Sequence, residues 1–377
     1  MNERNLSIII NNYISRYDEI LKSERPSPLW RSAERFKKLA DEAIAASEED
    51  FTGKLFKLSE ISKNHIDTRF IQPMGSLCDY AEKEPETVRS LLKSFFADDW
   101  GNYSVRESKI SSFVEGCNEL RSKYFPRNIR YFMTPGKALT MLAMYNPDDN
   151  FMYQEASARL FAECVGFEEN WGIGAEFNYA VYYRMCLELT DCIARNQLLI
   201  FTSCKRYDGE EGLHADGNFH LLAYDIIRCN ASFKLFEGIK FTKAALEDNK
   251  TYQRLQNEAI TCFRKYQSFW DNNLKIKKGK ALLAKMAVPG AEVSHNKMGE
   301  GTIEAFDGEA VSVKFEDEGV KKFNLLQSVT AGFITLNDDG FAAWKEEFSG
   351  VLGSRDETMT QMDLVSAELE GLIALLC

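Results

Sequence analysis

The densest group of metal-ligand residue types in this sequence is His214-Ala215-Asp216-Gly217-Asn218-Phe219-His220. Two imidazoles and a carboxylate are ligands for zinc or iron, so His214, Asp216 and His220 define a candidate site for a metal-dependent enzyme. The alternative is an exposed turn in which Asp216 or Asn218 caps the helix that follows. Gly217 breaks the regular helix that would place both histidines on one face, and it favours the turn.

A second candidate site is the aromatic and basic segment 121–132. Its cations are the kind that contact phosphates, and its rings are the kind that stack on bases. The candidate nucleic-acid contacts are Arg121, Lys123, Arg127 and Arg130. The alternative is a helix end and loop whose aromatic residues lie in the core, so the sequence leaves direct nucleic-acid binding open.

Other catalytic patterns are missing from the sequence. It has four histidines and no Gly-x-Ser-x-Gly elbow, and its paired acidic residues, such as Asp148-Asp149, lack the lysine or histidine spacing of a nuclease or hydrolase. We therefore expect no catalytic residues and no cofactor. The metal site above is the alternative that would make the protein an enzyme.

The composition is that of a folded protein. The 377 residues are 45% hydrophobic and 27% charged, and 46 Lys and Arg against 57 Asp and Glu give a net charge of -11. This charge disfavours attraction of the whole surface to nucleic acid or an anionic membrane. No apolar run reaches the ~20 residues that cross a bilayer, and the nine cysteines form no Cys-x-x-Cys pair. We expect no membrane contact and a cytoplasmic location.

Apolar residues at helical spacing predict a mainly α fold, with an irregular helical bundle over residues 1–285. Pro28, Pro85 and Pro135 each stand where a helix is expected to begin. Leu198 to Cys204 reads instead as a short strand or an exposed connection. The expected helices cover residues 6–21, 28–44, 85–95, 110–120, 135–145, 153–164, 177–196, 219–227 and 252–270.

After Pro289-Gly290 the period of the apolar residues changes from 3.6 to 2. Short strands over 302–306, 311–315 and 320–323, separated by turns at Asp307-Gly308 and Asp317-Glu318-Gly319, predict a small SH3-like β-barrel over residues 286–337. Residues 338–377 are expected to form a C-terminal helical segment. Its last apolar face would seal a homodimer or pack back on the body; this face comprises Leu369, Leu372, Ile373 and Leu376.

The β-module resembles the Tudor or SH3-like domain that ends the UvrD/PcrA helicases. The resemblance covers about residues 287–337 and rests on the motif at 290–303, the strand 311–315 and the return strand 319–323. Met298 stands where the family usually has Phe. The resemblance implies the barrel fold, and the module's excess of acidic residues favours a protein partner over a phosphate backbone. A groove near Phe306, Phe315 and Phe323 is the expected contact surface.

A second segment, residues 134–153, is similar to helical regions beside McrB-like restriction ATPases in bacterial defence loci. This similarity implies a prokaryotic accessory role without an ATPase, because Gly136-Lys137 is followed by Ala138 and no P-loop is formed. We therefore expect a non-enzymatic bacterial adaptor that binds a protein partner through its β-module, within a nucleic-acid-processing or phage-defence complex.

Overall fold

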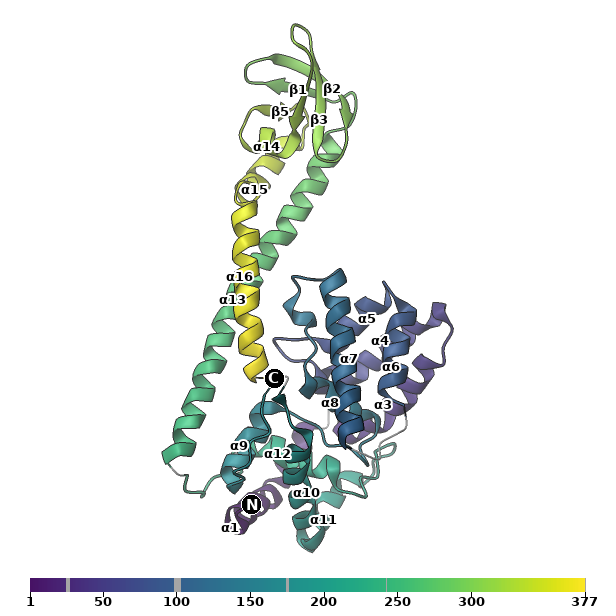
Figure 1. Ribbon diagram of the computed structural model, residues 1–377, viewed down its shortest axis with the longest axis vertical. Coiled ribbons are helices and arrows are strands. Elements are labelled where there is room, and N and C mark those ends of the chain that lie inside the picture. The colour runs from purple at the N-terminus through teal and green to yellow at the C-terminus, as the bar shows by residue number, and fades with distance from the viewer. Residues whose placement is uncertain (25–27, 98–102, 174–175, 242, 377) are drawn as a thin grey trace. The chain divides into compact units, whose positions relative to one another are not determined.

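The computed structural model is mainly helical, as expected, and describes residues 1–24, 28–97, 103–173, 176–241 and 243–376 (Figure 1). The chain forms two compact units. The larger unit comprises Met1–Ala259 and Glu370–Cys377, and the smaller unit comprises Ile260–Leu369. The division of the sequence into domains over 1–285, 286–337 and 338–377 stays a prediction.

The larger unit is built from helices joined by short loops. Prolines begin several of them, as at Pro73, Pro85 and Pro135, and Gly166 ends another in the left-handed conformation with φ +62°. The helices are α1 (Glu3–Ser15), α2 (Tyr17–Glu24), α3 (Leu29–Ile44), α4 (Glu48–Ile66), α5 (Pro73–Ala81), α6 (Pro85–Phe95), α7 (Tyr103–Tyr124), η1 (Ile129–Tyr131), α8 (Pro135–Tyr145), α9 (Glu155–Val165), α10 (Tyr179–Arg195), α11 (Gln197–Cys204), η3 (Lys205–Tyr207) and α12 (His220–Ser232).

The expectation of a strand or exposed connection at 198–204 is wrong, because this run forms α11. Asn196 ends α10, and its side-chain Oδ1 accepts a hydrogen bond of 3.0 Å from the backbone N–H of Leu199, which caps α11. Leu198 and Phe201 are 60% and 73% exposed. The apolar run that resembles a buried strand therefore lies largely on the solvent side of a short helix.

One core fills the larger unit, with side chains from α1 to α12. Its largest fully buried side chains include Tyr13 and Tyr17 at the junction of α1 and α2, Trp30 of α3 and Tyr182 of α10. None of the helices in the described ranges is both long and apolar enough to cross a bilayer.

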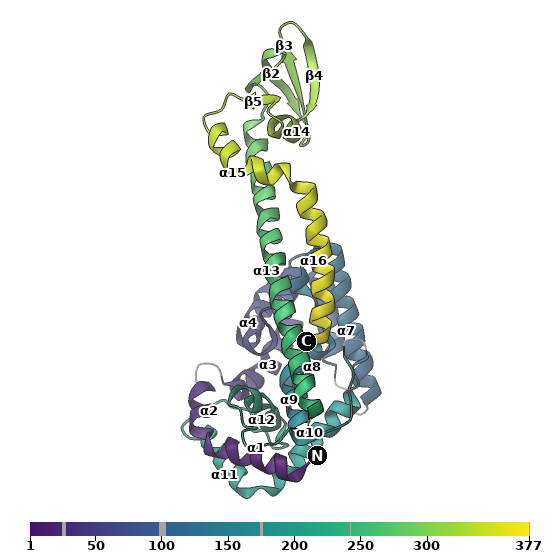
Figure 2. The same ribbon diagram turned by 90° about the vertical axis from the view of Figure 1, so that its left-hand side faces the viewer.

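The smaller unit contains a five-stranded antiparallel sheet (Figures 1 and 2). Its strand order is β4-β3-β2-β1-β5. Its elements, with the helix that leads into it from the larger unit, are α13 (Lys243–Met286), β1 (Glu292–His295), β2 (Gly299–Phe306), β3 (Ala310–Phe315), β4 (Gly319–Asn324), α14 (Leu325–Thr330), β5 (Ile334–Leu336), α15 (Phe341–Gly353) and α16 (Arg355–Leu376). The strands expected at 302–306, 311–315 and 320–323 lie within β2, β3 and β4.

The expected closed barrel is corrected by this strand order: among the described strands, β4 and β5 are the two edges and do not pair with each other. The sheet core is covered by helices instead of by a returning strand, with Leu283 of α13, Val329 of α14 and Trp344 of α15 packed on Val313 and its neighbours. Gly301 is required in β2, because a Cβ there would lie 2.8 Å from the ring of Phe315.

Helices α13, α15 and α16 pack together in the smaller unit. The indole N–H of Trp344 donates a hydrogen bond of 2.8 Å to the carbonyl oxygen of Gly279. A Cβ at Gly279 would lie 3.0 Å from the ring of Phe348, so the small residue permits this close approach. Both views show α16 alongside α13, and the thiol of Cys262 lies 3.5 Å from the carbonyl oxygen of Val365 (Figures 1 and 2).

Candidate functional site

A groove of about 370 Å³ opens in the smaller unit beside the end of β2. Its apolar wall includes Phe306 together with Leu325 and Leu326 of α14. Its polar lining includes Lys280 of α13 and Arg355, the first residue of α16. The groove thus combines a hydrophobic wall with two cations and one carboxylate, that of Glu309.

Local hydrogen bonds fix the two backbone segments that border the groove, the turn after β2 and the start of α14. The carboxylate of Asp307 accepts from the backbone N–H groups of Glu309 and Ala310 at 3.1 and 2.7 Å, and Gly308 turns the chain with φ +98°. This turn ends β2 directly after Phe306. Asn324 caps α14 by accepting from the backbone N–H of Gln327 at 3.0 Å, which places the leucines of α14 beside the turn.

The two cations of the groove are unpaired. Neither Lys280 nor Arg355 forms an ion pair or a side-chain hydrogen bond with a described residue. Burial, followed by the positive charge of Arg355, lowers the pKa of Lys280. Arg355 also stands in the first turn of α16, where the helix dipole disfavours a positive charge. The carboxylates of Glu309 and Asp356 act on the pKa of Lys280 in the opposite direction.

Of the three aromatic residues expected to contact a partner, only Phe306 lines the groove. Phe315 is 1% exposed and belongs to the sheet core. Phe323 is half-buried on β4, with its ring 6.0 Å from that of Phe315 and 5.3 Å from that of His295. His295 is structural, because its Nδ1 accepts from the backbone N–H groups of Lys297 and Met298 at 3.1 and 3.2 Å.

The candidate metal ligands have separate partners. The ring of His214 lies between two carboxylates, with Nδ1 3.3 Å from Glu34 and Nε2 3.1 Å from Asp148. The carboxylate of Asp216 accepts from the backbone N–H groups of Leu221 and Leu222, both at 2.9 Å, and so caps α12.

His220 also points to a partner of its own: its Nδ1 donates to the carbonyl oxygen of Pro147 at 2.9 Å, and burial lowers the pKa of its ring. Within the described ranges, no three or more His, Cys, Asp or Glu side chains gather in a way that would hold a metal. The hydrogen bonds of Asp216 agree with the alternative interpretation, in which this residue caps the helix that follows.

The basic segment does not form a stripe of free cations. Arg121 is largely buried, pairs with Glu370 at 2.6 Å and lies over the ring of Phe132. Lys123 pairs with Glu84, which lowers the pKa of that carboxyl to about 2 through hydrogen bonds from Lys123, Tyr124 and Thr87.

Of the two remaining cations of the segment, one lies before η1 and the other lies within it. Arg127 is exposed before η1, and Arg130 is half-buried within it. The backbone carbonyl of Arg130 accepts a hydrogen bond of 2.6 Å from the N–H of Gln72. The segment is therefore fixed to the body through its backbone, and Arg121 and Lys123 carry carboxylate partners.

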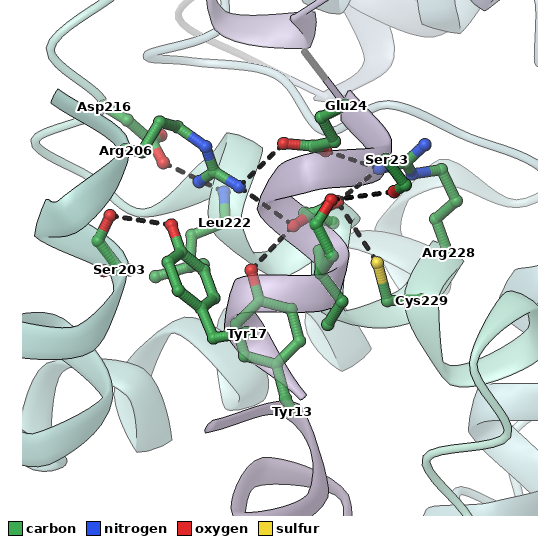
Figure 3. Close-up of polar contacts among 12 residues, drawn as sticks. Tyr13, Tyr17, Ser23, Glu24, Ser203, Arg206, Asp216, Leu222, Arg228 and Cys229 are labelled. Atoms are coloured by element: carbon green, nitrogen blue, oxygen red, sulfur yellow. Dashed lines mark hydrogen bonds and ion pairs between the residues drawn. The ribbon is translucent and has the colours of Figure 1, made fainter. Parts of the chain in front are cut away.

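The larger unit also contains a buried cluster of charged residues that the sequence did not predict (Figure 3). Arg206 of η3 contacts Glu24 at 3.0 Å and Asp225 at 3.2 Å. Arg228 contacts the same two carboxyls at 2.5 and 2.7 Å. The hydroxyl of Tyr13 donates to Asp225 at 2.6 Å. These five residues, the charge cluster, join α1, α2, η3 and α12.

The two carboxyls of the charge cluster differ in their protonation. Burial raises the pKa of Asp225, but the charges of Arg228 and Arg206 outweigh burial and lower it below the usual range. Burial, followed by the negative charge of Asp225, raises the pKa of Glu24 to about 8. The signal in the sequence was Asp225 itself, a carboxylate inside the apolar run of α12. The cluster has a structural role, because its ion pairs and the hydrogen bond from Tyr13 join four elements inside the core; the Nε atoms of Arg206 and Arg228 have no hydrogen-bond partner in the described ranges.

Comparison with known proteins finds no family model that matches the chain, no similar curated protein and no similar solved structure.

Proposed function

We propose that this protein is a non-enzymatic adaptor that binds a protein partner through the groove of its smaller unit. The observation that carries the proposal is the pair of unpaired cations, Lys280 and Arg355, beside the apolar wall formed by Phe306 and the leucines of α14. Unpaired charge next to apolar surface favours a segment that brings both a carboxylate and a hydrophobic side chain. The partner segment is therefore acidic and apolar.

The outer edge of β4 supports the same proposal. Among the described strands β4 pairs only with β3, so its outer backbone groups are open to an added strand. Val320 is 54% exposed on this strand. An extended segment that enters the groove beside Asn324 would continue along this edge, since Asn324 is the last residue of β4 and also lines the groove.

The Tudor-like character of the module and its place in a bacterial nucleic-acid-processing or phage-defence complex are parts of this proposal, and both come from the resemblances in the sequence. No feature favours the metalloenzyme, since the candidate ligands have separate partners. The basic segment favours nucleic-acid binding less than the groove favours a protein, because Arg121 and Lys123 are paired.

The experiment compares cross-linked complexes captured from bacterial lysate by the full chain and by two variants. Lys280→Glu with Arg355→Glu reverses the charge of the groove. Lys297→Glu with Lys345→Glu makes the same change of charge at exposed positions of the same unit that do not line it. We expect the first variant to lose a partner that the wild type and the control retain, with cross-links at the groove. Equal capture by all three proteins overturns the proposal.

A further inference from the structure

A second cavity, of about 450 Å³, lies in the larger unit where the first residues of α8, α9 and α10 meet one face of α7. Its lining includes four aromatic rings and two exposed carboxylates, and these groups determine which ligands fit. The rings are Phe132, Tyr153, Phe177 and Tyr179, and the exposed carboxylates are Glu107 and Glu115.

Three of the rings form one continuous wall. The ring of Phe177 meets those of Tyr153 and Tyr179 edge to face, with centroids 4.7 and 4.8 Å apart. The faces of aromatic rings carry negative potential and attract cations. This attraction is strongest where water is excluded, and all three of these residues are buried.

The charge of the cavity is negative. Glu107 and Glu115 stand two turns apart on α7, and neither pairs with a cation in the described ranges. No lysine, arginine or histidine is found among the described residues that line the cavity. A third carboxylate in the lining, Glu155, is already engaged by Arg159 and by the hydroxyl of Tyr153. Two carboxylates are thus left for a ligand.

The hydroxyl of Tyr179 is the independent sign of a missing ligand. Tyr179 is 4% exposed, and its Oη is buried without a hydrogen-bond partner in the described part of the chain. Its neighbours on α10 are satisfied: Tyr183 contacts Asn150 at 3.0 Å and Tyr182 donates to the carbonyl oxygen of Met152 at 2.5 Å. A buried polar group without a partner costs about 1–3 kcal/mol, which a polar ligand atom would recover.

We propose that this cavity binds an alkylated ammonium cation that carries a hydroxyl or carbonyl group. The rings surround the alkylated nitrogen, Glu107 and Glu115 balance its charge, and the oxygen of the ligand bonds to the hydroxyl of Tyr179. Alkyl groups on the nitrogen match the apolar walls and leave less hydration to remove than a bare ammonium does. This site is separate from the partner groove and does not depend on the proposed function.

Calorimetric titration of the full chain with choline tests the proposal, with 3,3-dimethylbutan-1-ol as the neutral probe of the same shape. We expect choline to bind at least about tenfold more tightly, as cation–π attraction in a desolvated site implies. Equal binding of both probes, or no saturable binding of choline, overturns the proposal. A peptide with trimethyllysine, titrated beside its unmethylated form, shows whether a protein-borne ammonium binds better than the free one.

Three variants locate the site. Glu107→Gln with Glu115→Gln should remove the preference for choline, while Glu119→Gln, on the same helix but outside the lining, should retain it. Tyr179→Phe should weaken choline binding without lowering the unfolding midpoint, because the hydroxyl has no partner to lose. Unchanged choline binding in the double glutamate variant overturns the assignment of the cavity, whatever its stability.

Discussion

The guanidinium of Arg206 lies over the ring of Trp30, with its Cζ 3.2 Å from the ring centroid. The same guanidinium reaches Glu24 and Asp225, so one side chain joins α3 to the charge cluster of α2 and α12. A buried cation held by both a ring and carboxylates is satisfied only while all of them are present. The contact therefore links the stability of the N-terminal helices to that of α12.

Asp225→Asn should destabilise the larger unit by about 3–5 kcal/mol, because it leaves the buried guanidinium of Arg206 and the half-buried one of Arg228 with too little negative charge. Urea unfolding of the full chain, followed by tryptophan fluorescence, measures the change. Glu237→Gln is the control, since it removes an exposed pair with Arg16 at 2.7 Å and should cost at most about 1 kcal/mol. Similar costs for the two variants would contradict the role of the cluster.

Glu24→Gln should cost clearly less than Asp225→Asn at pH 7. The pKa of Glu24 is raised to about 8, so this carboxyl is mostly protonated at neutral pH and glutamine resembles it. The pKa of Asp225 is lowered, so asparagine removes a real charge there. The same unfolding experiment compares them, and a larger cost for Glu24→Gln would show that the charge resides on Glu24.

His65 should make the larger unit less stable in acid. Burial, followed by the charge of Arg228, lowers the pKa of His65 to about 4 from an ordinary 6.5. The folded state thus binds the proton less well than the unfolded state, and the contribution of His65 is present above pH 6.5 and is lost as the pH falls through 4. Unfolding free energies at pH 7, 5.5 and 4 measure this effect.

His65→Gln is the reference for that measurement, because Asp67, whose pKa is raised to about 6 by burial, acts in the opposite direction in both proteins. The difference between the wild type and His65→Gln should therefore shift steadily toward the variant as the pH falls from 6.5 to 4. If the difference in unfolding free energy between the two proteins does not depend on pH, burial does not lower the pKa of His65.

Gly279→Ala should destabilise the smaller unit by about 1–3 kcal/mol, because its Cβ would press on the ring of Phe348. Gly350→Ala is the matched control. It lies on an exposed face of α15 with open space around it, so the change should stabilise the helix by about 0.5–1 kcal/mol. Calorimetric melting of the full chain separates the two, and a shift of the same sign in both would count against the close packing of α13 on α15.

Local signals in the sequence were sufficient for much of the secondary structure. The prolines at 85 and 135 begin helices, Gly166 ends one, and the glycines at 308 and 319 turn the chain between strands, because each position constrains the backbone by itself. The run at 198–204 was misread because a short helix with exposed apolar residues has the composition of a strand.

Contacts between distant residues could not be predicted in the same way. The groove needs Lys280 and Arg355, which are 75 positions apart in the numbering, beside Phe306. Phe315 has the same residue type as Phe306 and lies on the same, core-facing side of the sheet, but it stands opposite Gly301 and is 1% exposed, whereas Phe306 ends β2 opposite Val311 and is only half-buried. The position of Phe306 at the end of β2, beside α14, therefore distinguishes this groove residue from the core residue Phe315.

The open edge of β4 also restricts how the free protein behaves at high concentration. An edge that accepts an added strand from a partner would equally accept β4 of a second molecule, which is the first step of sheet growth. Lys321 and Lys322 lie on this strand, paired with Glu318 at 3.3 Å and Asp307 at 3.1 Å. Two copies brought edge to edge would place these lysines close together, and their like charges would oppose the pairing that the backbone alone allows.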